Sequence, residues 1–103
     1  MSRYILAPLA QEDLTSIRDY YLEAAGQRIA RRMLIEFVEA FRTLARNPGL
    51  GHKRPDLAGD RPVLFWAVRD YLVLYRAEQK PLEVIMIVRG TRDIPTLINR
   101  RKL

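Results

Sequence analysis

Two helical patterns of apolar residues follow one another almost without a spacer, and this constrains the fold more than any other feature. The first pattern repeats at alternating steps of four and three, at Ala10, Leu14, Ile17, Tyr21 and Ala24. The same rhythm returns in a second stretch from about Arg28 to Arg46. Each pattern predicts an α-helix with one apolar face. Gly26 lies between them and can adopt the left-handed backbone of a helix end, so an antiparallel helical hairpin is expected.

The chain after the hairpin has the composition of short β-strands. Residues 63–68 and 71–75 are rich in β-branched and aromatic side chains, and residues 82–88 are apolar except for Glu83. Only Arg69 and Asp70 separate the first two segments, so a tight turn must join them. These segments predict a three-stranded antiparallel meander.

The remaining segments complete a predicted α+β fold. A short strand over residues 3–7 precedes the hairpin, because Pro8 ends or redirects it. Residues 50–62 hold too many turn formers for regular structure. Asp93 is expected to cap a last helix over residues 94–100. The fold is thus an N-terminal strand, an antiparallel helical hairpin, a three-stranded antiparallel meander and a short C-terminal helix, in a single domain over residues 1–103.

The composition excludes several classes of protein and site. The chain has 103 residues and no cysteine, which excludes a disulfide framework and a thiolate metal site and fits a cytoplasmic location. No apolar run approaches the roughly 20 residues that span a bilayer, so no membrane contact is expected. His52 is the sole histidine, and neither serine stands in a nucleophile's turn. The sequence predicts no catalytic residue, no metal site and no cofactor.

The charge is basic and unevenly distributed. Lys and Arg number 18 against 12 Asp and Glu, a formal net charge of +6. Residues 48–103 carry most of this excess, with eleven basic residues against six acidic ones. Glu12 and Asp13 lie off the apolar stripe of the first helix, so we expect both on the solvated face of that helix. An arginine-rich surface suits an acidic protein or a nucleic acid, and the alternative is charge that serves solubility.

Most of the basic residues in this half stand near the predicted strand ends or in the loop before them. A meander brings alternate strand ends together, so we expect several to gather along one rim of the sheet. Such a rim would hold a phosphate backbone or receive acidic side chains. The alternative is dispersed surface charge. The predicted target-binding residues are Lys53, Arg54, Arg61, Arg76, Arg89 and Arg92.

The first two meander strands are apolar on both faces. Either they lie inside the fold, or one face of the sheet is left for a partner. In the second case a partner would pack on the apolar surface between hairpin and sheet. The residues predicted for this contact are Leu64, Trp66, Tyr71 and Val73.

Several short motifs, in this order and spacing, resemble the RelE/ParE superfamily of bacterial type II toxins, and the ParE branch most closely. They are spread over nearly the whole chain, at residues 10–14, 17–20, 44–48, 51–57, 71–76 and 87–93. The resemblance implies a small cytoplasmic toxin that a cognate, ParD-like antitoxin wraps and blocks. It implies two possible activities: ParE-like members inhibit DNA gyrase, and RelE-like members cut messenger RNA on the ribosome.

The residues favour the first activity. Many relatives have a histidine before the glycine at the end of the last strand, where this chain has Arg89, and no Tyr or His follows Tyr75. Cleavage of RNA needs a group that accepts the proton of the 2′-hydroxyl, and arginine cannot accept it. We therefore favour a toxin that binds gyrase, with the ribosome-dependent endoribonuclease as the alternative. A nucleic-acid-binding module, with Tyr71 and Tyr75 as stacking platforms, is a third hypothesis.

Overall fold

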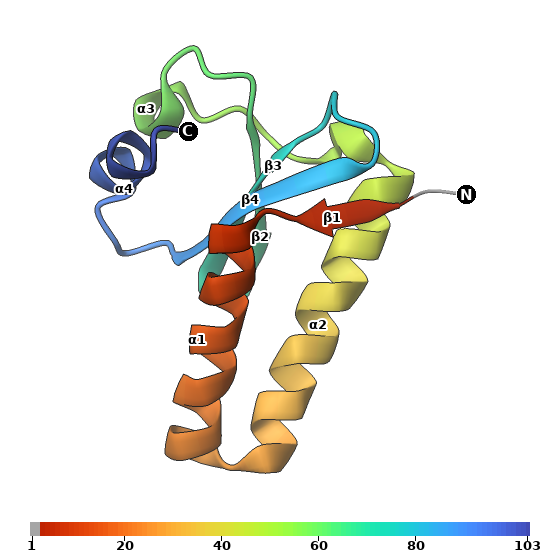
Figure 1. Cartoon of the computed structure of the whole chain (residues 1–103), viewed down its shortest axis with the longest axis vertical. Helices are drawn as coiled ribbons and strands as arrows, with labels where there is room; N and C mark the ends of the chain where they lie inside the picture. Colours follow the sequence, from red (N-terminus) through yellow and green to blue (C-terminus); the bar gives the residue numbers. More distant parts are fainter. Residues whose placement is uncertain (1–2) are drawn as a thin grey trace.

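The predicted helical hairpin is present, with α1 (Pro8–Ala25) and α2 (Gln27–Arg46) as its arms. The computed structural model describes residues 3–103. Gly26 is the single residue between the helices, and its φ of 88° is a left-handed value that residues with a side chain rarely adopt. The arms lie side by side, and their connection stands at the end farthest from the sheet (Figure 1). Glycine thus permits the sharp reversal that folds one helix back on the other.

The strands form one sheet of order β1-β4-β3-β2. The predicted meander is confirmed: β2 (Leu64–Val68), β3 (Tyr71–Arg76) and β4 (Leu82–Arg89) pair antiparallel in turn. The short β1 (Tyr4–Leu6) adds to the outer side of β4 in parallel. Its three residues cover only the first part of β4, and α1 packs beside the rest. The α+β fold class predicted from the sequence is therefore correct.

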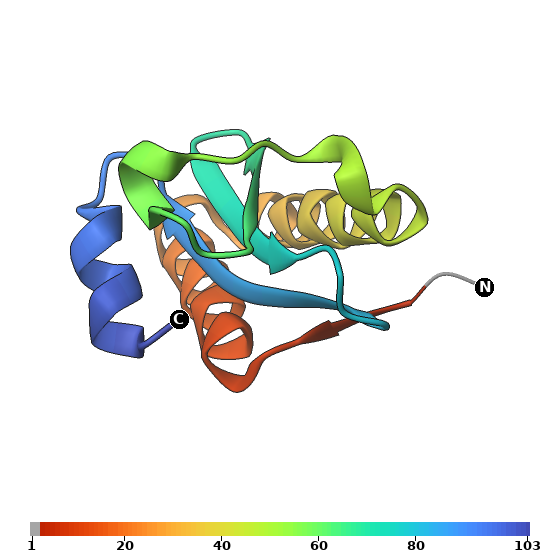
Figure 2. The same ribbon diagram turned by 90° about the horizontal axis from the view of Figure 1, so that it is seen from above.

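Both faces of the sheet are covered, which decides between the two alternatives for the apolar strands. The hairpin packs on one face, with Phe37, Phe41, Val73, Tyr75 and Val84 fully buried between them. On the other face lie α3 (Pro55–Ala58) and α4 (Ile94–Arg101), seen together at one side of the sheet in Figure 2. The side chains buried on this face include Phe65, Leu74, Ile85, Met86 and Ile98. The strands lie inside the fold.

The segment between hairpin and sheet is more regular than predicted. A single 3₁₀ turn spans Pro48–Leu50, and one turn of α-helix, α3, follows. His52 and Phe65 exchange backbone hydrogen bonds of 2.9 and 2.8 Å, forming an antiparallel bridge at the outer side of β2. The prediction of irregular structure over residues 50–62 is therefore wrong in part. The prediction used only the turn propensity of the segment itself, whereas the bridge depends on pairing with Phe65, more than ten residues further along the chain.

A buried tyrosine anchors this segment to the sheet. The Tyr75 hydroxyl donates to the carbonyl oxygen of Pro48 at 2.7 Å and accepts from the Gly51 N–H at 2.8 Å. A Cβ atom at position 51 would lie 2.5 Å from that hydroxyl oxygen, so only glycine allows this close approach.

No helix within residues 3–103 has the length and hydropathy needed to cross a bilayer.

Candidate functional site

The six basic residues predicted to bind a target, several of which were expected along one rim of the sheet, lie in separate places. Arg76 and Arg89 stand at opposite ends of the β3–β4 ladder. Lys53, Arg54 and Arg61 surround a cavity of about 200 Å³ beside α3. The prediction of a single rim is wrong, because β3 and β4 run antiparallel and each arginine is the last residue of its strand.

Arg61 holds the C-terminus against the loop before β2. Its guanidinium donates to the carbonyl oxygens of Leu103 at 2.6 Å and Ala58 at 3.0 Å, and to Oδ1 of Asn99 at 2.8 Å. With three donor groups engaged inside the chain, Arg61 fastens α4 to α3. The structure therefore gives Arg61 a structural role, which differs from the target-binding role predicted for it.

Two more of the six form ion pairs within the chain. Arg54 makes a bidentate pair with Asp56, at 3.0 and 2.8 Å. Arg76 donates to Glu83 across the β3–β4 ladder at 2.9 Å, and both side chains are half-buried. The hydrogen bond from Arg54 lowers the pKa of Asp56, so this pair stays ionised at neutral pH. Each guanidinium is thus at least partly neutralised before any partner arrives.

Arg89 lies between two aromatic rings at the end of β4. Its guanidinium carbon is 5.3 Å from the ring centroid of Tyr20 and 5.1 Å from that of Tyr71. Tyr71 is buried and packs edge-on against Phe37, whereas Tyr20 is 54% exposed. Both contacts have the distance of a cation–π interaction, which orients the guanidinium without neutralising its charge. Arg89 is therefore a positioned cation at the molecular surface.

An open cavity of about 370 Å³ surrounds Arg89 between α1, the end of β4 and α4. Arg92, three residues past the end of β4, and Arg101, on α4, also line it. Asp13 is the only carboxylate among its described lining residues, against these three arginines. The lining is completed by Ser16, Ile17, Tyr20, Tyr71, Ile87, Val88 and Leu97. The cavity therefore attracts an anionic group.

Asp13 and Arg101 form part of the cavity wall and, because they pair with each other, are not free to bind a partner. The two side chains make a bidentate pair at 2.7 and 2.8 Å, and both are largely buried. Oδ2 of Asp13 also accepts from the backbone N–H of Ile87 at 3.0 Å, on the part of β4 beyond the residues that pair with β1. Asp13 thus joins α1, β4 and α4. The predicted solvated face is wrong for Asp13, because its partners lie 74 and 88 residues away in the sequence.

The groups around Arg89 suit anion binding better than acid–base chemistry. Burial, and secondarily its interaction with Tyr21, raise the pKa of Tyr71 to about 12, so its hydroxyl keeps its proton at neutral pH. Both oxygens of Asp13 already accept hydrogen bonds. Within residues 3–103, no three His, Cys, Asp or Glu side chains are grouped to hold a metal ion. Arg89 and Arg92 can hold a carboxylate or a phosphate there.

The four residues predicted to contact a partner face the hairpin. Val73 is fully buried and Tyr71 is 5% exposed, so the predicted open apolar surface at these two is wrong. The stripes of α1 and α2 already fill the space over them. Leu64 and Trp66 pack against the same core but keep part of their surface exposed on the edge strand β2.

Comparison with known proteins shows which family this chain belongs to. The family model described as the ParE toxin of the type II toxin-antitoxin system, parDE, matches residues 4–94. The chain belongs to the ParE toxin family. No curated protein sequence matches it. The match to the ParE family model runs from β1 to the start of α4 and includes Arg89 and Arg92.

A solved structure supports the same fold. The chain is similar to a structure described as the chromosomal ParDE toxin-antitoxin system from P. aeruginosa, with a TM-score of 0.71 and 22% sequence identity. The match covers 86% of this chain and 96% of that one. At this identity the likeness shows a shared ParE architecture, and the residues of the site must be argued from this chain.

Sequence reasoning found two residues of the site in this ParE chain and missed three. The sequence predicts Arg89 and Arg92, but it places Asp13 on a solvated face and gives no role to Tyr20. Arg101 is one of several basic residues near the C-terminus, and nothing in the sequence distinguishes it from the others. The available signal was the pairing of an acid near the start of α1 with a basic last helix, but only the folded chain brings them within 2.7 Å.

Proposed function

We propose that this member of the ParE toxin family arrests bacterial growth in the cytoplasm by binding DNA gyrase, and that a cognate ParD-like antitoxin neutralises it. Family membership supports the toxin–antitoxin part of this proposal. The gyrase target rests on the cavity around Arg89. There, Arg89 and Arg92 present positive charge that no carboxylate of the described residues pairs with.

One observation supports binding rather than cleavage: a positioned cation lies beside a carboxylate whose oxygens already accept hydrogen bonds. Arg89 is oriented by two rings, and the carboxylate beside it is held by Arg101 and the Ile87 N–H. Such a site grips an acidic side chain of a target protein. A ribosome-dependent nuclease would require a proton acceptor near the bound phosphate, and Tyr71 and Asp13 are poorly suited to that role.

The antitoxin contact is the second part of the proposal. Leu64 and Trp66 lie on β2, whose outer side pairs only at the His52–Phe65 bridge within the described chain. An antitoxin segment that packs on these two side chains would lie along this edge of the sheet. Leu64→Ala and Trp66→Ala, which remove apolar contact area without placing a charge against the core, are expected to weaken antitoxin binding without reducing toxicity.

Expression of the chain alone in bacteria tests the proposed function. We expect growth arrest with filamentation and a DNA-damage response, relieved by co-expression of the antitoxin encoded beside it. Arg89→Ala and Arg92→Ala should each relieve the arrest, whereas Arg100→Ala should not, since Arg100 is exposed on α4 and does not line the cavity. Rapid cleavage of messenger RNA at ribosomal A-site codons would instead support the nuclease alternative.

A further inference from the structure

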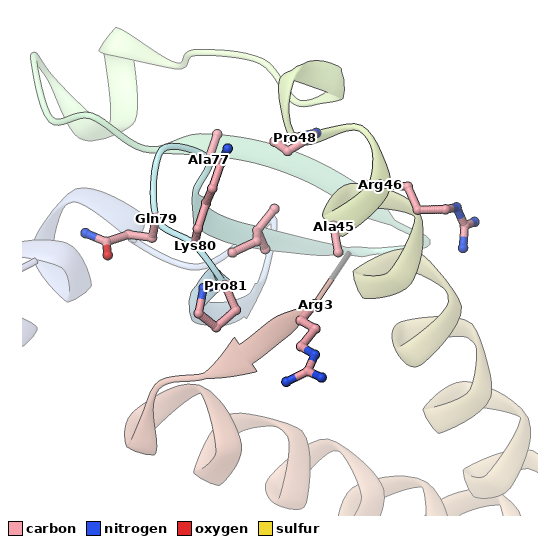
Figure 3. A pocket seen from close by; sticks show the side chains of 9 residues that line it. Arg3, Ala45, Arg46, Pro48, Ala77, Gln79, Lys80 and Pro81 are labelled. Atoms are coloured by element: carbon pink, nitrogen blue, oxygen red, sulfur yellow. The ribbon is translucent and has the colours of Figure 1, made fainter. Parts of the chain in front are cut away.

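A second cavity lies at the other end of β4 from Arg89 and has no role in the proposed function. It has a volume of about 440 Å³ and lies between β1, the end of α2 and the turn from β3 to β4 (Figure 3). Much of its lining is apolar, from Ala45, Pro48, Ala77, Pro81 and Leu82. Arg3, Arg46 and Lys80 are its cations, and in Figure 3 the guanidinium groups of Arg3 and Arg46 point away from its centre. An apolar hollow with a positive margin fits an apolar side chain flanked by carboxylates.

The outer face of α2 carries a matching groove of about 300 Å³. Ile35 is 49% exposed there, and Leu34 and Val38 lie beside it with part of their surface exposed. Arg31 and Arg42 bound the groove at its two ends. None of these three apolar residues belongs to the buried stripe of α2, so the packing of this chain does not explain their exposed surface. An apolar strip between two arginines resembles one half of an interface.

The groove and the cavity are continuous along the helix. A smaller hollow lined by Glu39, Arg42, Thr43 and Arg46 shares Arg42 with the groove and Arg46 with the cavity. Positions 31, 35, 38, 42 and 46 follow one another at steps of four, three, four and four, which places them on one helix face. We call this surface, from Arg31 to the Arg46 cavity, the α2 track.

The charge of the α2 track is strongly positive. Glu39 is its only carboxylate among the described lining residues. Its five cations have no carboxylate within 4.0 Å in residues 3–103, in contrast to the paired arginines of the fold. They are Arg3, Arg31, Arg42, Arg46 and Lys80. The surface is therefore apolar along its middle and carries unpaired positive charge along its length.

We propose that the α2 track is the docking site of an acidic amphipathic segment of the antitoxin, an inference that rests on the proposed function. The segment would place apolar side chains at helical spacing on Ile35 and Val38 and one more in the cavity at Arg46. Its Asp and Glu side chains would pair with the five cations.

The chemistry of the surface favours this occupant over two others. A second copy of the chain would bring a net charge of +6 and the same cations against themselves, which costs energy. A nucleic acid would satisfy the arginines but leave Ile35 and Val38 facing a phosphate backbone. An acidic protein segment satisfies both the apolar strip and the charges.

Calorimetric titration with the purified antitoxin encoded beside this chain tests the inference. Ile35→Asp and Arg42→Glu are each expected to weaken binding about tenfold or more, since each places a charge that opposes the segment. Matched controls lie on α1: Leu22→Asp at a site 42% exposed and Arg18→Glu at one 48% exposed. These controls should change the affinity less than about threefold. If Ile35→Asp fails to fold, Ile35→Ser replaces it.

The other outcomes overturn the inference and are distinguishable from failure of the proposed function. Unchanged antitoxin affinity in both track variants would overturn it. So would a wild-type dimer that Ile35→Asp dissolves, or DNA or RNA binding that depends on Arg42. If the chain alone arrests growth while the track variants bind the antitoxin normally, only this inference fails. If it neither arrests growth nor binds the antitoxin, the proposed function fails as well.

Discussion

The C-terminal half of the chain and the outer face of α2 use arginine in opposite ways. Residues 48–103 hold most of the excess positive charge in the sequence, but many of their arginines bind groups of the same chain: Arg54, Arg61, Arg69, Arg76 and Arg101. The α2 arginines at 31, 42 and 46 belong to the nearly neutral half, yet no carboxylate of the described residues lies within 4.0 Å of them. Net charge along a sequence therefore does not locate the available charge on the folded surface.

The same contrast appears within the single cavity at the end of β4. Arg101 is held by Asp13 and belongs to the wall, whereas Arg89 and Arg92 remain available. The three arginines line the same cavity, but only Arg89 and Arg92 can exchange their bound water for an anionic group of a partner. Arginines that hold the fold should therefore respond to substitution differently from arginines that are free to bind.

Removal of the Asp13 carboxylate should have the largest effect. Asp13→Ala breaks three hydrogen bonds and leaves Arg101 and the Ile87 N–H unpaired in a largely buried place. We expect the free energy of unfolding to fall by about 3 kcal/mol, measured by urea denaturation. A loss below about 1 kcal/mol would mean that the joint of α1, β4 and α4 does not depend on this ion pair.

Loss of the Arg61 guanidinium should have the next largest effect. Arg61→Ala removes three donors that fasten the C-terminus to the loop before β2, at a cost of about 2 kcal/mol. Hydrogen exchange should speed up first in the amides of α4. Uniformly faster exchange through the whole sheet would contradict this local role.

The free arginines should show the reverse behaviour. Arg92→Ala should keep the melting temperature within about 2 °C while weakening target binding about tenfold, since Arg92 is exposed and has no carboxylate partner in residues 3–103. Arg54→Ala, a change of the same size at a paired site, is the control and should alter target affinity little. Equal losses in both variants would abolish the distinction between free and paired arginines.

The smallest expected effect concerns alkaline pH. The pKa of Tyr71 is raised to about 12 in the folded chain, mainly by burial, against about 10 when unfolded. The folded chain holds the Tyr71 proton more tightly than the unfolded chain does. The contribution of this protonation to the stability of the folded chain is therefore complete below pH 10 and is lost as the pH rises toward 12. Tyr71→Phe keeps the ring and removes the titrating hydroxyl, so its stability should fall less than that of the wild type from pH 10 to 12. Parallel curves from urea denaturation at each pH would refute this.

Local patterns were enough to predict the hairpin, the strands and the last helix, but not the 3₁₀ turn and α3 between hairpin and sheet. The four-and-three rhythm through Phe37 and Phe41 and the left-handed glycine at position 26 specify the hairpin, and the two-residue connection at Arg69 specifies the first turn of the meander. These signals lie within a few residues of one another. They required no knowledge of which segments meet in space.

The candidate site could be predicted only in part, because its pairings span most of the chain. Arg89 and Arg92 could be predicted from their position at and just beyond the end of the last strand. The pairing of Asp13 with Arg101 depends on the docking of α4 beside α1, and the burial of Val73 depends on how completely the hairpin covers the sheet. Sequence charge and hydropathy report neither of these.

The central claim is that this ParE toxin acts through Arg89 and Arg92 by binding its target without cutting RNA. A supercoiling assay with purified gyrase, run beside cleavage of messenger RNA on programmed ribosomes, tests it most directly. The account predicts that the wild-type chain blocks supercoiling, that Arg89→Ala and Arg92→Ala do so only at concentrations about tenfold higher, and that transcripts stay intact. Transcripts severed on the ribosome, with gyrase fully active, would contradict it.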